Sequence, residues 1–336
     1  MCWENSLLTA GTGGRITVVT SLAGTLGSDD YDEFGLLHEN AAEWEIPFER
    51  RPVVSRASHT LPTGQALSYL RWGDGDPELV FLHGGAQNAH TWDTVILALG
   101  RPALAVDLPG HGHSDRRADR DYGPWENAQA VAALIESVAP RARCVIGMSL
   151  GGATTIRLAA QRPDLCRRAV IVDVTPQIND SSRQLTTAER GTVSLIAGPP
   201  VYDSFEEMAD AAVALSPYRA ASGVRRGVRH NARRLDDGRW TWRYDLFGPP
   251  PAEPTAEPSG AAAWVDFTSL WEDVSAIAVP ALFVRGGLSP FVQDEDIAEM
   301  QRRLPALEVV VVEGAGHAVQ SDRPLVLAEL ITTFVK

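Results

Sequence analysis

The chain has 336 residues, of which 44% are hydrophobic, so it holds enough apolar material for one large core or two modest ones. Its 43 acidic and 30 basic side chains give a formal net charge of −13, which argues against a surface that neutralises nucleic-acid phosphates. The apolar runs are far shorter than the roughly 20 residues of a membrane-spanning helix, and three cysteines without a signal-peptide pattern fit a cytoplasmic protein that has no disulfide framework.

The first 50 residues differ from the rest of the chain in charge. They contain nine acidic residues against two arginines, and so carry seven of the 13 net negative charges. Glycine and serine interrupt this stretch and leave residues 16–19 as a possible short strand. We therefore predict a weakly ordered acidic extension over residues 1–50, either a simple appendage or a tail with a partner.

From residue 53 onward, short β-rich runs alternate with longer helical stretches. The eight predicted strands span 53–56, 66–72, 79–82, 103–107, 144–147, 169–174, 281–285 and 309–312. The predicted helices span 89–99, 125–138, 150–162, 294–304 and 323–333. This alternation predicts an α/β fold with an open, mostly parallel eight-stranded sheet that helices cover on both faces.

The alternation stops between the sixth and seventh predicted strands. Helix-like pieces fall near 203–215 and 218–235, and a proline-rich stretch follows at 248–260. Because this insertion starts and ends at consecutive strands, we expect residues 176–270 to form a helical lid over the carboxyl ends of the sheet, where open α/β sheets bind ligands. The predicted core then comprises residues 51–175 and 271–336.

Ser149 lies between a predicted strand and a predicted helix in the sequence Gly147-Met148-Ser149-Leu150-Gly151-Gly152. The small residues on both sides permit a tight turn that lifts the serine hydroxyl above the end of the sheet. GxSxG in this setting is typical of a serine nucleophile; the alternative is a serine in a structural turn. A serine hydroxyl needs a base at neutral pH. His317 fits best, because it follows the last strand in a glycine-rich stretch, Glu313-Gly314-Ala315-Gly316-His317, at the same edge of the sheet.

Two further turns complete the pattern. His83-Gly84-Gly85 follows the third strand, and Asp107-Leu108-Pro109-Gly110-His111-Gly112-His113-Ser114 follows the fourth. With Ser149 preceding His317 in the chain, these motifs resemble the α/β-hydrolase superfamily over residues 53–336, and most of all its small capped serine hydrolases. That group includes esterases, carbon–carbon bond hydrolases, lactonases and cofactor-free perhydrolases, so the resemblance implies a fold and a mechanism rather than a substrate.

The resemblance also implies where the reaction's negative charge is stabilised. Attack by Ser149 on a carbonyl places this charge on the substrate oxygen, and fixed backbone donors stabilise it. By the superfamily pattern the donors of this oxyanion hole are the N–H groups of Gly85 and Leu150; a merely tight turn at Gly85 is the alternative. The candidate pocket residues are His90, Trp92 and Met148, although a tryptophan that opens a helix beside a sheet is at least as often packing.

The third member of the triad departs from the usual superfamily pattern. The loop after the seventh strand, residues 285–292, holds no acid before Asp294. Asp173 closes the sixth strand 24 residues after Ser149, which resembles the arrangement in haloalkane dehalogenases. A buried carboxylate there would pair with the Nδ1–H of His317, so Asp173 is the first candidate. The alternatives are Asp294 after a loop rearrangement, a dyad in which Ser289 or water orients the imidazole, and an Asp173 that only caps a loop.

Two other groups of residues admit more than one interpretation. His111 and His113 form an HxH pair, but no further carboxylate–histidine cluster accompanies them, so we expect no metal and no cofactor. Eight arginines lie within 218–243, and we expect them to pair mainly with acids such as Asp236 and Asp237; in the alternative, one or two bind an anionic substrate. The aromatic residues expected to form the lid core, or alternatively a substrate cage, are Trp240, Trp242, Tyr244 and Phe247.

We therefore predict a serine hydrolase that cleaves an ester, thioester or lactone bond of a small-molecule substrate with the triad Ser149, His317 and Asp173. A serine nucleophile disfavours epoxide hydrolase and haloalkane dehalogenase activity, because both need an ester on a carboxylate. The alternatives among enzymes are a perhydrolase or cofactor-free haloperoxidase and a carbon–carbon bond hydrolase. A non-catalytic binding protein of the same fold is the alternative outside enzymes. The oligomeric state stays open.

Overall fold

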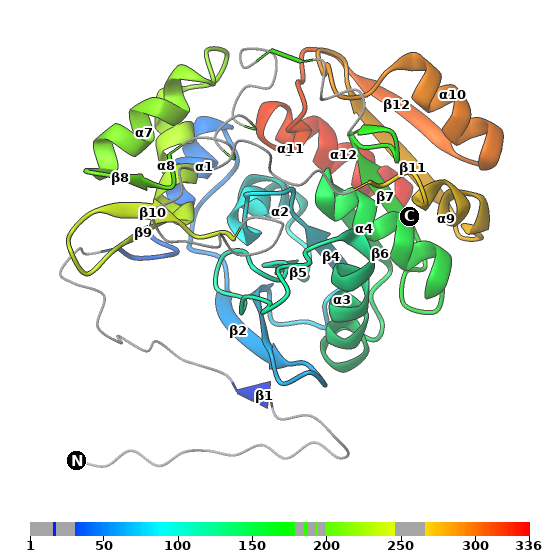
Figure 1. Cartoon of the computed structure of the whole chain (residues 1–336), viewed down its shortest axis with the longest axis horizontal. Coiled ribbons are helices and arrows are strands. Elements are labelled where there is room, and N and C mark those ends of the chain that lie inside the picture. Colours follow the sequence, from blue (N-terminus) through cyan, green and yellow to red (C-terminus); the bar gives the residue numbers. More distant parts are fainter. Residues whose placement is uncertain are drawn as a thin grey trace.

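The main sheet runs through the middle of the molecule with the strand order β1-β2-β3-β5-β4-β6-β7-β11-β12 (Figure 1). This computed structural model describes residues 16–17, 31–178, 185–186, 193, 196, 199–245 and 266–336. The strands are β1 (Ile16–Thr17), β2 (Val54–Thr60), β3 (Ala66–Trp72), β4 (Leu79–Leu82), β5 (Ala103–Val106), β6 (Cys144–Met148), β7 (Ala169–Val172), β11 (Ala281–Gly286) and β12 (Glu308–Val312). All eight predicted strands are present, and β1 adds a ninth of two residues.

The sheet is mostly parallel. Parallel pairing joins β5 to β4 and continues through β6, β7, β11 and β12, whereas β1, β2 and β3 form an antiparallel edge. Every residue of β4, β5, β6 and β7 is buried. These strands are continuous apolar runs because both of their faces are covered.

Helices cover the two faces of the sheet, as predicted. They are η1 (Ala89–Trp92, a 3₁₀ helix), α2 (Asp93–Leu99), α3 (Pro124–Val138), α4 (Leu150–Gln161), α9 (Leu270–Ala276), α10 (Asp294–Arg303), α11 (Val319–Asp322) and α12 (Pro324–Phe334). Along β4, Val80 and Leu82 pack into one core with α3, α4, α9 and α10, while Leu79 and Phe81 pack into the other with α2, α11 and α12. This alternation follows from the two-residue period of a strand. Among the described residues, no helix has both the length and the apolarity to cross a membrane.

The segment before β2 corrects the prediction of a weakly ordered extension for part of its length. Helix α1 (Leu37–Glu43) packs against α2, and its residues Leu37 and Ala41 are 1% exposed. They lie four positions apart and therefore share one face of the helix. The many acidic residues around them make this apolar spacing difficult to recognise in the sequence. Apart from β1, the remainder of residues 1–30 lies outside the described residues.

The insertion between β7 and β11 is not purely helical, which corrects the lid prediction. It contains α7 (Phe205–Ala214) and α8 (Ala221–Asn231), beside α1 in Figure 1, together with a three-stranded sheet in the order β8-β10-β9. These strands are β8 (Val201–Tyr202), β9 (Ala232–Arg234) and β10 (Trp240–Trp242). The chain turns between β9 and β10 at Gly238, whose φ of 91° favours glycine. The proline-rich stretch at 248–260 lies outside the described residues.

Candidate active site

Ser149 stands at a sharp turn between β6 and α4. Its φ of 52° and ψ of −117° are strained for a residue with a side chain. The neighbouring glycines are needed because a Cβ at Gly147 would lie 2.1 Å from the carbonyl oxygen of Gly151, and one at Gly151 would lie 2.2 Å from that of Leu82. The serine N–H donates to the carbonyl of Val172 at 3.0 Å. The sequence thus forces the serine out at the end of the sheet, as expected from GxSxG.

The turn after β4 lies against this serine. A Cβ at Gly84 would stand 2.6 Å from Sδ of Met148 and 3.2 Å from Cβ of Ser149. In the described part of the chain, the N–H of Gly85 has no hydrogen-bond partner, and a Cβ there would meet nothing within 4 Å. Leu150 is the first residue of α4, where backbone N–H groups lack partners within the helix. Two backbone donors therefore flank the serine.

Two neutral histidines hold this turn in place. The N–H of Leu108 donates to Nε2 of His83 at 2.9 Å, so that nitrogen is unprotonated and Nδ1–H donates to the carbonyl of Gly84 at 2.7 Å. The N–H of Ala86 donates in the same way to Nε2 of His111 at 3.2 Å. Burial lowers the pKa of His83 to about 3 and also lowers that of His111. Both rings are structural supports rather than bases.

His317 and Asp173 meet at the same edge of the sheet. Asp173 is fully buried directly after β7, and its Oδ2 lies 2.7 Å from Nδ1 of His317, which follows β12. The carboxylate also accepts the N–H of Gly286 at 2.8 Å and the hydroxyl of Ser289 at 2.5 Å. An acidic acceptor at Nδ1 leaves Nε2 of His317 as the free nitrogen. The ring of Phe291 lies 4.3 Å from that of His317, centroid to centroid.

The alternatives for the acid lie elsewhere. The side chain of Asp294 is 87% exposed and pairs with Arg285. The hydroxyl of Ser289 binds the carboxylate of Asp173 rather than the imidazole. Ser289 therefore differs from its predicted role as a partner of His317, and nothing in the sequence distinguishes these two positions for its hydroxyl.

All three candidate pocket residues are buried. Trp92 is fully buried, with its ring 5.1 Å from that of Phe81 in the core between the sheet and α2. His90 is also buried, and both of its ring nitrogens contact carboxylates. Met148 is 1% exposed and packs beneath Gly84. The tryptophan is therefore packing, the alternative that sequence analysis had left open.

The loop after β5 is held by its aspartate. The carboxylate of Asp107 accepts Arg56 at 2.6 Å and the backbone N–H groups of Ala89 and His113 at 2.8 and 3.0 Å. Burial raises the pKa of Asp107, but the Arg56 charge and these hydrogen bonds outweigh burial and hold it well below its usual range. Because His111 is engaged with the turn after β4, the HxH pair is part of this scaffold. The position of Arg56 carries no signal in the sequence.

Four of the eight lid arginines pair with acids in the described part of the chain, and Asp237, but not Asp236, is among these acids. The ion pairs are Arg219 with Asp322, Arg225 with Glu206 and Asp210, Arg226 with Glu39 and Glu43, and Arg239 with Asp237. Two of these acids belong to α1, so the acidic N-terminal segment and the basic lid neutralise each other. Trp242 stacks on Tyr244 in the small core of the lid, and Phe247 lies outside the described residues.

A model of the alpha/beta hydrolase family matches residues 79–330 of this chain. The chain belongs to this family. The esterase Rv0045c of Mycobacterium tuberculosis is 48% identical over 301 residues, which cover 89% of this chain and 94% of the relative. A solved structure of that esterase matches with a TM-score of 0.77 and 47% identity, covering 91% of this chain and 99% of the other.

A second relative is more distant. The 2-(acetamidomethylene)succinate hydrolase of Mesorhizobium japonicum is 26% identical over 280 residues, covering 83% of this chain and 95% of the relative. The family match and the esterase relative together identify this protein as an α/β-hydrolase-fold enzyme of the carboxylic-ester hydrolase type.

Proposed function

We propose that the protein hydrolyses an ester-like bond of a small-molecule substrate, an ester, thioester or lactone, with Ser149 as nucleophile and His317 and Asp173 completing the triad. The 2.7 Å contact between Asp173 and His317, at the edge of the sheet where Ser149 stands, carries this proposal. The esterase relative supports a carboxylic ester as the first substrate to test.

The reaction proceeds in two halves. In the first, Nε2 of His317 accepts the hydroxyl proton as Oγ of Ser149 attacks the carbonyl carbon, and the N–H groups of Gly85 and Leu150 stabilise the oxyanion by about 3 kcal/mol each. The imidazolium then protonates the leaving group, and an acyl-enzyme remains. In the second half His317 takes a proton from the water that attacks the acyl carbon, and the imidazolium returns it to Oγ of Ser149 as the acyl–serine bond breaks and the acid leaves. Asp173 fixes the tautomer of His317 and stabilises the imidazolium.

The hydrogen bonds that Asp173 accepts support its proposed role in orienting His317. Besides His317, its carboxylate accepts a backbone N–H and the hydroxyl of Ser289. These donors prevent the side chain from rotating away from the imidazole. The acids that neutralise Arg225 and Arg226 leave these two arginines unsuited to binding an anionic substrate.

Active-site labelling tests the proposal. A fluorophosphonate probe should label the wild-type protein, and Ser149→Ala should abolish labelling without changing the circular dichroism spectrum. A panel of ester, thioester and lactone substrates then defines the bond that is cleaved. A folded wild-type protein that takes no label would overturn the catalytic role and favour a binding protein. A protein that takes the label and catalyses peroxide-dependent bromination in acetate, but hydrolyses no substrate of the panel, would be a perhydrolase instead of a hydrolase.

A further inference from the structure

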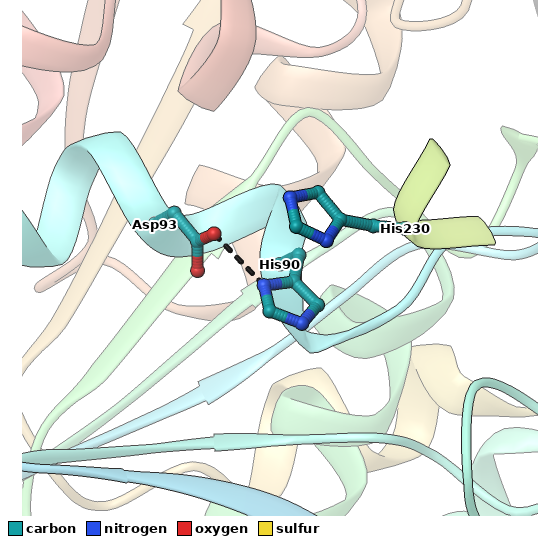
Figure 2. Close-up of side chains that lie close together, drawn as sticks. All are labelled: His90, Asp93 and His230. Carbon is teal, nitrogen blue, oxygen red and sulfur yellow. Dashed lines mark hydrogen bonds and ion pairs between the residues drawn. The ribbon is translucent and has the colours of Figure 1, made fainter. Parts of the chain in front are cut away.

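A second group of titratable side chains, three of them buried and two partly buried, lies where the N-terminal segment, the core and the lid meet. This junction cluster consists of Tyr31, Glu33, His90, Asp93 and His230, and none of them belongs to the triad. Figure 2 shows the ring of His230 lying over His90, beside the Asp93 carboxylate. The His90 and His230 rings stack with centroids 3.9 Å apart and planes 12° apart.

Each histidine of the cluster has one ring nitrogen held by a fixed partner. Nε2 of His90 lies 3.0 Å from a carboxylate oxygen of Glu33, and Nδ1 of His230 lies 2.6 Å from the hydroxyl of Tyr31. Metal-binding histidines show this arrangement, because a carboxylate, carbonyl or other polar group on the outer nitrogen orients the ring and its inner nitrogen. The inner nitrogens here are Nδ1 of His90 and Nε2 of His230.

The inner groups are incompletely satisfied. Nε2 of His230 and Oδ1 of Asp93 are both buried and have no hydrogen-bond partner among the described residues. His230 is 4% exposed and Asp93 is fully buried, so solvent does not compensate for the missing partners. Nδ1 of His90 bonds only Oδ2 of Asp93, at 2.8 Å. Two potential ligand atoms without hydrogen-bond partners, next to an imidazole–carboxylate pair, are an arrangement expected of a metal-binding site.

We propose that Nδ1 of His90, Nε2 of His230 and one carboxylate oxygen of Asp93 form a binding site for a divalent transition metal ion of the Zn²⁺ type. Two imidazoles and one carboxylate are a ligand set that suits Zn²⁺, Co²⁺ and Ni²⁺, with water in the fourth position. The expectation of no metal from the HxH pair is unaffected, because this site uses different residues.

The site requires a small adjustment to bind the ion. One candidate ligand atom from each of the three residues already lies within 4.8 Å of the other two. Ligand atoms around a tetrahedral Zn²⁺ lie about 3.3 Å apart, given bonds of about 2.0–2.1 Å. The His230 ring must also tilt from its stacked position, so that its lone pair points at the ion. Binding displaces the proton between His90 and Asp93 to solvent, with no change of oxidation state.

The consequence of binding is a tie between lid and core. His230 lies on α8 of the lid, whereas His90 and Asp93 lie on η1 and α2 of the core. Next to them, Asn231 on α8 donates to the carbonyl of Ala86 at 2.7 Å, in the turn that carries Gly85. An ion at the junction cluster therefore fixes the lid above the proposed oxyanion donors.

Metal binding to the full-length protein tests this site. The protein is unfolded and refolded with one equivalent of Co²⁺ or Zn²⁺, so that burial does not prevent entry, and bound metal is measured after dialysis. Co²⁺ should bind at one ion per chain and give the visible absorption of a tetrahedral complex. His230→Asn and Asp93→Asn should each weaken binding at least tenfold, and Tyr31→Phe, which leaves all three ligands in place, should weaken it about tenfold.

Two control variants locate the ion. His38→Asn removes an exposed histidine and should leave binding unchanged. His317→Ala should also leave it unchanged, because the catalytic imidazole is not a ligand of this site. The proposal is overturned if wild-type protein refolded with metal binds none. It is equally overturned if binding survives in Asp93→Asn and His230→Asn, or if His317→Ala abolishes it. Because Tyr31→Phe retains the ligands, it still tests the site should a ligand variant fail to fold.

Discussion

Two histidine–carboxylate pairs, His317 with Asp173 and His90 with Asp93, occupy different surroundings. His317 contacts one carboxylate, Asp173, and its other nitrogen has no hydrogen bond within the described residues. His90 contacts two carboxylates, Asp93 and Glu33, one at each nitrogen. A histidine with one free nitrogen can accept and return a proton, whereas a histidine held at both nitrogens is fixed in its charged form.

The contacts of the junction cluster shift the pKa values of His90 and Glu33 from their usual values. Burial lowers the pKa of His90, but the charges and hydrogen bonds of Asp93 and Glu33 outweigh burial and raise it to about 9. Burial raises the pKa of Glu33, but its hydrogen bond to His90 and its pairing with Arg56 lower it to about 2. The same two residue types therefore make a candidate base at one site and a structural cation at the other.

The largest expected effect is at the proposed catalytic pair, His317 and Asp173. Asp173→Asn should lower kcat by about 10⁴-fold, because an amide at this position favours the imidazole tautomer that cannot accept the serine proton. Steady-state hydrolysis of an activated ester measures the loss. Asp294→Asn is the matched control and should keep near-normal turnover, since Asp294 is exposed and pairs with Arg285. Near-normal kcat in Asp173→Asn would refute the assignment of the acid.

The second prediction concerns pH and the junction cluster. The pKa of His90 is raised in the folded protein, so its contribution to stability is fully present below about pH 6.5 and is lost as pH rises through about 9. Urea unfolding in EDTA, at pH 6 and at pH 9.5, should show the advantage of wild type over His90→Asn shrinking by roughly 3 kcal/mol. The other titratable groups of the cluster are Tyr31, Glu33, Asp93 and His230, and the charged groups that face it are Arg56, Arg226, Arg229 and Arg243.

The difference between wild type and variant isolates His90 from the other titrating groups, provided both are unfolded under the same conditions. An advantage that stays constant or grows with pH would mean that the imidazole is neutral in the folded protein. The charged character of this second pair would then be wrong.

A third, smaller effect is expected from Ser289→Ala. This change removes one donor to Asp173 and leaves the donors from Gly286 and His317 in place. A hydrogen bond to a charged group contributes about 1.5–3 kcal/mol, so the free energy of unfolding should fall by about that amount. The loss in kcat should be far smaller than in Asp173→Asn. An equal loss in both variants would indicate that the serine, rather than the carboxylate, orients the imidazole.

Most of the fold, and the meeting of Ser149, His317 and Asp173 at one edge of the sheet, could be predicted because the signals are local. The apolar strands and the turn around Ser149 depend on neighbouring residues, and Asp173 became the first candidate for the acid because it closes such a strand. The hairpin of β9 and β10 was missed, although Asp237-Gly238 before Trp240 is a turn signal. The junction cluster could not be predicted, because Tyr31 and His230 are 199 positions apart and neither belongs to a motif.

The smallest predicted effect is a difference in the free energy of unfolding between variants of two neighbouring arginines on α8, Arg225 and Arg226. Arg226 is buried and pairs with Glu43 and Glu39 of α1, whereas Arg225 pairs within the lid and is 35% exposed. Arg226→Met should lower the free energy of unfolding by about 1 kcal/mol or more, because it leaves a partly buried Glu43 unpaired and removes a contact between two segments. Arg225→Met should change it by less than about 0.5 kcal/mol, because exposed ion pairs contribute little. Urea unfolding of both variants measures the difference. Equal effects would show that the ion pairs of Arg226 with α1 do not hold the lid in place, and the lid would then depend on its other contacts, such as the ion pair of Arg219 with Asp322.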